Sequence, residues 1–293
     1  MHTYLRAVGF SKVDNRIELD KILGIVMSSP LVKKETTLDS DIRFSEMRYD
    51  FSERLGITIR GEYDELGFFH LDNYFPHAIG KSETLREELF VNRRVDTDAY
   101  TGMCEDFRVG VSLIFYLQNS IDYICSKKEL NQVSTFLPIS LSALSLSGTI
   151  LLPIHKDEQI DKRQREDYRR RHELLNEASK GSQDAIEHLA LEDIDTYSMI
   201  NRRLKTEDIY SIVDTTFIPY GSESDNYTVI GTILEVSLHT NKLSGENIYE
   251  LVLNCNDLVF SVFINTKDLE GNPLPGRRFK GNVWMQGCVD FSI

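Results

Sequence analysis

The sequence predicts an α+β protein with an N-terminal antiparallel sheet and helix, a central helical segment, and a small C-terminal β-module. Three observations support this class. One early stretch has apolar residues at helical spacing, several later stretches alternate apolar and polar residues with a period of two, and residues 156–173 are almost entirely charged or polar. We therefore expect three regions, at residues 1–154, 155–217 and 218–293.

The first helix is predicted over residues 15–28. Asp14 can cap its start and Pro30 stops it. One face of this helix would carry four apolar side chains, those of Leu19, Ile22, Leu23 and Val26. Such a stripe is typical of a helix that packs on a sheet.

Seven strands are predicted in the remainder of the N-terminal region. The clearest pair is a hairpin whose strands are joined by the turn sequence from Asp64 to Gly67. Ser147 and Gly148 separate the last two strands. The predicted ranges are 42–51, 57–63, 68–75, 86–95, 108–117, 135–146 and 149–154. Their succession along the chain favours an antiparallel sheet with the helix on one face.

The central region is predicted to be helical and solvated. Between residues 156 and 173, seven Lys or Arg residues stand among six Asp or Glu residues. Opposite charges at close spacing are typical of an exposed helix rather than of a nucleic-acid-binding arm. Further helices are expected from Ser182 and after Asp195, followed by a strand-like stretch at 207–217. The charged helix is also a candidate interface in an oligomer.

The C-terminal region is predicted to be a compact β-module. Alternating apolar residues mark four strands, at 227–238, 248–253, 258–264 and 279–289, and Gly231, Gly281 and Gly287 interrupt them. This pattern fits a small barrel of the oligonucleotide/oligosaccharide-binding (OB) type. A two-sheet sandwich fits it as well, and the sequence leaves both open.

The candidate binding residues lie at the start of the last strand. Arg277, Arg278 and Lys280 are cationic, and in an extended strand Arg278 and Lys280 would share a face with Trp284, the single tryptophan. Cations beside an aromatic ring on an exposed sheet face can hold an acidic partner. Two other interpretations stay open: the arginines can pair with Asp268 or Glu270, and the tryptophan can belong to the core.

The net charge indicates which class of partner to expect, and the cysteines indicate which compartment. The chain of 293 residues has a net charge of −13, which opposes general binding to nucleic acids or anionic membranes. We therefore favour a protein partner or homo-oligomer over nucleic acid, and we expect no binding to a membrane. No secretory signal is visible and no two of the four cysteines are close in sequence, so we expect a cytoplasmic protein with reduced thiols.

The motifs of common catalytic sites are missing from the sequence. Gly276 and Gly281 have the spacing of a phosphate-binding loop, but Asn282 replaces the required lysine. The short acidic run at residues 192–195 and the stretch at 172–176 do not have the spacing of metal ligands. No cofactor or metal is expected, and the interpretation leans away from an enzyme.

One enzymatic alternative stays open. His70 and His77 lie near the end of an aromatic-rich strand, and each has a carboxylate nearby in sequence or across the hairpin, Asp72 or Glu62. A histidine and a carboxylate within hydrogen-bond reach can act as a general acid–base pair. This alternative predicts a pocket in the N-terminal region.

Four stretches of the chain carry a resemblance to a known family. They are residues 1–10, 110–119, 193–200 and 276–287, the last of which contains the candidate binding residues. These stretches resemble an uncharacterised bacterial family, domain of unknown function 3881, over the whole chain. The resemblance implies a cytoplasmic bacterial protein of one architecture, and it implies no activity, cofactor or catalytic residue.

Overall fold

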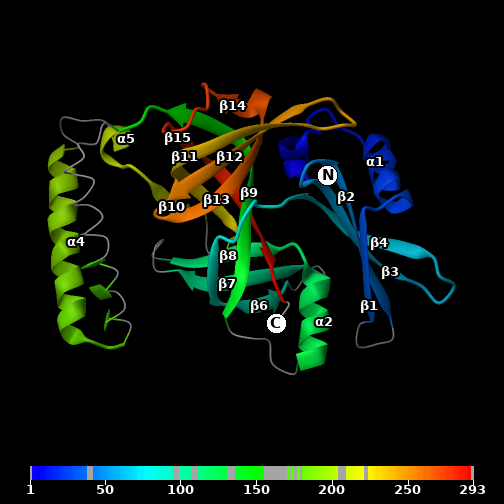
Figure 1. Cartoon of the computed structure of the whole chain (residues 1–293), viewed down its shortest axis with the longest axis horizontal. Coiled ribbons are helices and arrows are strands. Elements are labelled where there is room, and N and C mark those ends of the chain that lie inside the picture. The colour runs from blue at the N-terminus through cyan, green and yellow to red at the C-terminus, as the bar shows by residue number, and fades with distance from the viewer. Residues whose placement is uncertain are drawn as a thin grey trace.

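Two β-sheets make up most of the protein, and helices lie along their margins (Figure 1). The computed structural model describes residues 2–37, 42–94, 99–106, 111–130, 136–154, 170–171, 173–174, 177–178, 180–203, 209–220 and 224–291. None of the helices within these ranges has the length and apolar character that a bilayer crossing requires.

The first sheet contains four antiparallel strands that follow one another in chain order. The prediction that all seven N-terminal strands share one antiparallel sheet is wrong, because the strands expected from residue 86 onward join the second sheet. They are β1 (Val32–Thr37), β2 (Arg43–Ser52), β3 (Leu55–Tyr63) and β4 (Phe69–Ala78). Helix α1 (Arg16–Ser28) packs on β2 and β3, and all four predicted apolar residues of its face are buried. Asn15, rather than Asp14, caps the helix, because its side chain accepts a hydrogen bond from the backbone nitrogen of Glu18 at 2.9 Å.

The second sheet is large and mixed. Its members are β5 (Leu85–Glu88), β6 (Phe90–Arg93), β7 (Tyr100–Asp106), β8 (Val111–Leu117), β9 (Phe136–Leu151), β10 (Thr216–Pro219), β11 (Asn226–Thr240), β12 (Asn247–Cys255), β13 (Leu258–Asn265), β14 (Leu269–Glu270) and β15 (Arg278–Val289). The remaining elements are η1 (Thr3–Val8), α2 (Ser120–Leu130), α4 (Gln183–Arg203), α5 (Ile209–Ile212) and η2 (Thr266–Asp268).

Five strands of the second sheet pair in a closed circuit. β11 pairs with β12 and β12 with β13, both antiparallel, and β13 pairs with β9 in parallel. β9 pairs with β15, and β15 returns to β11, both antiparallel. The interior of this five-strand circuit is filled by apolar side chains, among them those of Leu251, Val262, Phe279, Val283 and Met285.

The circuit uses a strand from the N-terminal half of the chain. β9 ends at Leu151, and it hydrogen-bonds to β13 and β15, which both lie beyond residue 218. The C-terminal strands therefore do not complete the circuit among themselves. The boundaries predicted at residues 154 and 217 stay predictions.

One register shift explains a wrong prediction in β9. The sequence predicts two strands separated at Ser147 and Gly148, whereas β9 is continuous from Phe136 to Leu151. Its pairing with β15 shifts between Asn282 and Val283, so that Leu146 is left without a pairing partner. Such a bulge reverses the face to which alternate side chains point, and the broken alternation resembles a turn in the sequence.

The glycines of β15 make room for aromatic rings. A β-carbon at Gly281 would lie 2.6 Å from Cζ of Phe279, and one at Gly287 would lie 2.3 Å from Cδ2 of Phe115. Gly148, which is opposite Gly281, has the same role, because its β-carbon would lie 2.3 Å from Cε2 of Phe279. The rings therefore occupy space that a larger residue would fill.

Several other elements differ from the sequence-based prediction. The strand expected at 86–95 is divided into β5 and β6, and β1 and β7 were not predicted. The two helices expected from Ser182 and after Asp195 are one helix, α4, and the stretch at 207–217 forms α5 before β10 begins. The charged helix predicted at 156–173 lies mostly outside the described residues. Within it, Arg170 and Arg171 form ion pairs with Glu192 and Asp193 of α4.

The two sheets are joined by a second apolar cluster and by buried charges. Phe75 of the first sheet contacts Tyr116 of β8, with ring centroids 4.7 Å apart. Arg60, which is fully buried, donates hydrogen bonds to Glu46 at 2.7 Å and to the backbone oxygen of Gln118 at 2.6 Å. These contacts cover part of the outer face of the second sheet, and Trp284 is buried in the same apolar cluster.

Candidate functional site

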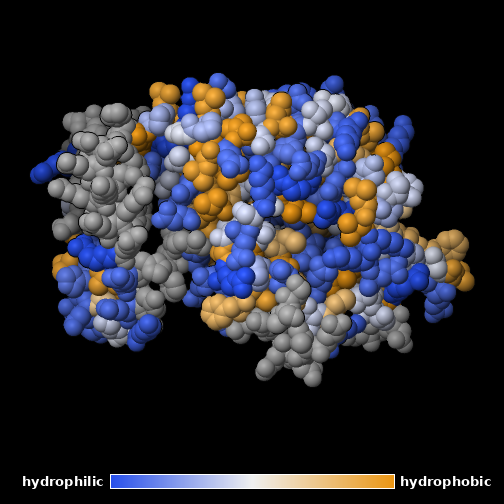
Figure 2. Space-filling model, in the orientation of Figure 1, coloured by the Kyte–Doolittle hydropathy of each residue, from blue (hydrophilic) through white to orange (hydrophobic). Residues whose placement is uncertain are grey.

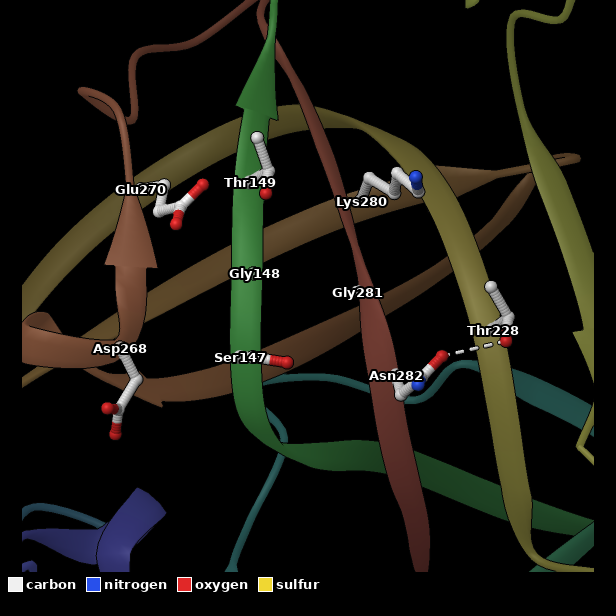
Figure 3. Close-up of a pocket in the computed structure, with 9 residues that line it drawn as sticks. All are labelled: Ser147, Gly148, Thr149, Thr228, Asp268, Glu270, Lys280, Gly281 and Asn282. Atoms are coloured by element: carbon white, nitrogen blue, oxygen red, sulfur yellow. Dashed lines mark hydrogen bonds between the residues drawn. The ribbon is translucent and has the colours of Figure 1, made fainter.

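A polar groove lies on the outer face of the five-strand circuit (Figure 3). Its volume is about 240 Å³, and it opens to solvent. Four elements contribute to it, namely β9, β11, β15 and the segment from η2 to β14. The lining residues are Ser147, Gly148, Thr149, Thr228, Asp268, Glu270, Lys280, Gly281 and Asn282. Every described lining residue is glycine, polar or charged.

Strand register places the lining side chains in two rows. Thr149 pairs with Glu270 of β14 on one side and with Lys280 of β15 on the other. In the adjacent row, Asn282 pairs with Ser147 of β9 and with Thr228 of β11. Because directly paired residues of neighbouring strands point to the same face, each row presents its side chains together.

Lys280 is the cationic residue among the described lining residues. Its ammonium group lies 4.3 Å from the ring centre of Tyr210 of α5 and donates a hydrogen bond to the hydroxyl of that tyrosine. An ammonium group has three N–H donors, so this contact leaves donors for a ligand. Tyr210 therefore holds the lysine at the margin of the groove.

The opposite side of the groove carries two carboxylates with different surroundings. Asp268 accepts two hydrogen bonds from the guanidinium group of Arg6, each 2.5 Å long. The side chain of Glu270 is exposed, and no hydrogen bond or ion pair to it is found within the described part of the chain. Because Arg6 offsets the charge of Asp268, Glu270 and Lys280 carry the remaining charges among the described lining residues.

The neutral side chains between these charges are hydroxyls and one amide. Thr228 donates a hydrogen bond to the side-chain oxygen of Asn282 at 2.8 Å (Figure 3). Ser147 and Thr149 supply hydroxyl groups from β9. Hydroxyl and amide groups both donate and accept hydrogen bonds, so the floor of the groove suits a hydrophilic ligand.

Arg278 is placed inside the protein, away from the groove. It is 4% exposed and donates hydrogen bonds to the backbone oxygens of Tyr210 at 2.7 Å, Val213 at 2.8 Å and Leu152 at 3.0 Å. Burial lowers the pKa of its guanidinium group. The side chain thus connects α5 and the residues after it to the ends of β9 and β15.

Trp284 is also buried, at 5% exposure. Its Nε1 donates a hydrogen bond to Asp225 at 2.9 Å, and its ring lies 4.9 Å from the ring of His2 and 5.2 Å from that of Tyr116. The ring points away from the circuit interior, as Lys280 does, but the N-terminal segment and β8 cover this end of β15. The shared exposed face of Arg278, Lys280 and Trp284 that the sequence suggests is therefore not formed.

Arg277 lies before β15 begins and does not line the groove. Its guanidinium group donates a hydrogen bond to the backbone oxygen of Asn272 at 2.8 Å. Asp268, which the sequence offers as a partner for these arginines, bonds instead to Arg6. Of the four predicted residues, Lys280 alone reaches the groove.

The two histidines of the enzymatic alternative lie at separate places on β4. His77 is 1% exposed, and its ring nitrogens lie 2.8 Å from Asp50 Oδ1 and 2.9 Å from Thr58 Oγ1. Burial lowers the pKa of His77, and the hydrogen bond with Asp50 opposes this shift. His70 is exposed and contacts Asp64 at 2.8 Å. Neither histidine lines the polar groove.

The surface also carries an apolar feature at the end of the β3–β4 hairpin. Leu66 is 83% exposed and Phe68 is 66% exposed. Figure 2 shows apolar surface at this projecting end of the hairpin, on the far right of the view. The tip is remote in sequence from the groove and shares no lining residue with it.

Most of the groove carries no signal in the sequence. Glu270 stands out there only as a possible partner of the arginines, and Thr149, Thr228 and Tyr210 lie in no pattern that marks a site. These residues come together through the pairing of β9 with β14 and β15, which joins distant parts of the chain. Within the described residues, no three His, Cys, Asp or Glu side chains are grouped so that they could hold a metal ion.

Comparison with known proteins places the chain in a family. No curated protein matches it, and no solved structure does. A family model described as "Domain of unknown function, E. rectale Gene description (DUF3881)" matches residues 5–287. That range includes the first sheet, all of the second sheet but the last two residues of β15, the groove and all four predicted binding residues. The chain therefore belongs to the DUF3881 family.

Proposed function

We propose that this protein is a binding or scaffold protein without catalytic activity, and that it holds an acidic group of its partner at Lys280 in the polar groove. The observation that carries this proposal is the position of Lys280. It is a partly exposed cation at the edge of a groove, held there by Tyr210, with hydroxyl and amide groups beside it. A preorganised cation loses little side-chain freedom on binding an anion, which favours affinity.

In this proposal the five-strand circuit is a small barrel of the OB type. The pairing of β15 with both β9 and β11 supports this view, because it returns the circuit to its first strand. The groove lies on the outer face of three neighbouring strands of the circuit, β9, β15 and β11. Ligands of such modules are held on an exposed strand face.

The net charge of −13 favours a partner that presents its acidic group locally. A long polyanion would be repelled by the remainder of the surface, whereas a short acidic group at Lys280 meets one nearby cation. A protein partner or a second copy of the chain therefore agrees better with the overall charge than a nucleic acid does. In this proposal the protein acts in the cytoplasm.

The proposal can be tested by reversing one charge. The immobilised full-length chain and its Lys280→Glu variant are compared for capture of partners from cell extract, with Arg16→Glu as the matched control. Arg16 is an exposed cation on α1, whose ion pair with Asp20 lies away from the groove. We expect Lys280→Glu to lose partners that the wild type and Arg16→Glu retain. Equal recovery by all three proteins would contradict the proposal.

A further inference from the structure

We infer that the polar groove binds a sugar unit that carries a single negative charge, such as a hexuronate. This inference rests on the proposed function, because it names the chemical class of the acidic group at Lys280. It adds a second contact, between sugar hydroxyls and Glu270. The sugar unit can be free or part of a chain, since the groove is open to solvent.

The lining requires a small hydrophilic ligand. All nine lining residues are glycine, polar or charged, so an apolar ligand would gain no apolar contact there. The volume of about 240 Å³ lies below the range of roughly 300–1,000 Å³ that is typical of sites for drug-sized ligands. A space of this size suits a ligand as small as one sugar ring.

The two uncancelled charges stand on opposite sides of this space. Glu270 and Lys280 both pair with Thr149, so two strand spacings, or roughly 10 Å, separate their backbones. A carboxylate accepts hydrogen bonds and an ammonium group donates them. A ligand that spans the row therefore needs a negative or accepting group near Lys280 and donating groups near Glu270. A sugar acid has both, because its hydroxyls can donate to Glu270.

The neutral side chains favour a sugar over a zwitterionic amino acid. An amino acid also offers a carboxylate and a donor, but its hydrocarbon part would cover Thr149, Ser147 and Asn282 and would remove their hydrogen bonds to water. The hydroxyls of a sugar can replace those water contacts, because hydroxyl groups both donate and accept. The second row, from Ser147 through Asn282 to Thr228, extends this polar surface beyond the first.

The test uses a panel of related probes and ligand-observed NMR with the full chain. Galacturonate, galactose and galactosamine differ in charge on one sugar scaffold, acetate has the carboxylate without the hydroxyls, and glycine is the zwitterion. We expect galacturonate to bind at least about tenfold more tightly than galactose, acetate or glycine, and galactosamine to bind no better than galactose. Trigalacturonate distinguishes a free sugar from a sugar within a chain. If it binds more tightly than galacturonate does, the natural ligand is a chain-linked sugar.

Three variants assign the contacts. Lys280→Gln should abolish the preference for galacturonate over galactose. Glu270→Gln should weaken galacturonate binding and leave acetate unchanged. Arg277→Gln is the matched control, because Arg277 is a neighbouring cation outside the groove, and it should bind as the wild type does. Unchanged thermal unfolding of each variant shows that the effects are not caused by loss of structure.

The outcomes separate this inference from the proposed function. Equal binding of galacturonate and acetate, with Lys280→Gln impaired toward both, overturns the sugar inference and leaves the anion site at Lys280 in place. Tighter binding of glycine than of galacturonate also overturns it. Galacturonate binding that does not depend on Lys280 contradicts both the sugar inference and the proposed function. Absence of galacturonate and trigalacturonate binding to the wild type overturns the inference, whatever partners the capture experiment finds.

Discussion

Arg54 donates hydrogen bonds to both carboxylate oxygens of Glu250, at 3.2 and 2.7 Å, although Glu250 is fully buried. Arg54 belongs to the turn between β2 and β3, and Glu250 lies on β12 of the five-strand circuit. His239 and Ser261, from the strands on either side of β12, also hydrogen-bond to Glu250. This ion pair therefore joins the two sheets at a point where solvent does not reach the carboxylate.

Replacing Arg54 by Met should destabilise the protein strongly. The substitution would leave a buried carboxylate without its main cation, and removal of one partner of a buried pair costs about 3–5 kcal/mol. We expect urea unfolding to show a loss of about 3 kcal/mol, because His239 and Ser261 still solvate the carboxylate. Arg16→Met, which removes an exposed ion pair with Asp20, should cost less than about 1 kcal/mol. Similar losses for both variants would contradict a stabilising role for this joint.

The free energy of unfolding should decrease as the pH is lowered from about 4.5 to about 2, because Glu250 becomes protonated in this range. Burial opposes ionisation of Glu250, but hydrogen bonds from His239, Arg54 and Ser261 outweigh it and lower the pKa from 4.5 to about 2. Because the folded state binds the proton less readily than the unfolded state, the contribution is complete above pH 4.5 and is lost as the pH falls toward 2. It amounts to about 3 kcal/mol. Glu250→Gln removes this titration, so urea unfolding should show a smaller acid dependence in that variant than in the wild type.

Gly281→Ala should destabilise the five-strand circuit. The new β-carbon would lie 2.6 Å from Phe279 Cζ and 2.7 Å from the backbone oxygen of Ser147, and the backbone cannot move without disturbing the strand pairing. Overpacking of this kind costs about 1–3 kcal/mol. Gly24→Ala in α1 is the control, since no atom lies within 4 Å of its new β-carbon, and it should stabilise by about 0.5–1 kcal/mol. Thermal unfolding should shift in opposite directions, and a higher melting temperature for Gly281→Ala would disprove the ring-packing explanation.

Two adjacent arginines should respond differently to the same substitution. Arg278→Met removes the hydrogen bonds to the backbone oxygens of Tyr210, Val213 and Leu152, so residues 209–214 should be cleaved faster in limited proteolysis. Arg277→Met removes a single exposed contact to Asn272 and should be cleaved at the wild-type rate. Mass spectrometry of the first fragments locates the cut. Equal cleavage rates in the two variants would show that Arg278 does not hold this segment.

The local pattern of the chain was sufficient to predict several elements. The stripe of apolar residues in α1 predicted both the helix and its buried face, because helical spacing alone places those side chains together. The period of two predicted the C-terminal strands and the β3–β4 hairpin. It failed at Leu146, where a bulge in β9 reverses the alternation without a turn.

The candidate site was only partly predictable. Alternation correctly placed Lys280 and Trp284 on the same face of β15, but it contains no information about what covers that face. His2, Tyr116 and the segment around them bury Trp284, whereas Lys280 stays at the groove. The sequence predicts that Arg278 is exposed beside Lys280. In the structure α5 and the residues after it cover Arg278, and their backbone oxygens accept its hydrogen bonds.

Short-range sequence patterns were sufficient to predict α1, most of the strands, the family and the cation-rich start of β15. Packing between distant segments selects which of those cations meets solvent and which side chains join it. Residues 147–149, 228, 268–270 and 280–282 come together because strands that are far apart in the chain hydrogen-bond to one another. Such pairing depends on register and on the packing of distant segments, neither of which a local pattern encodes.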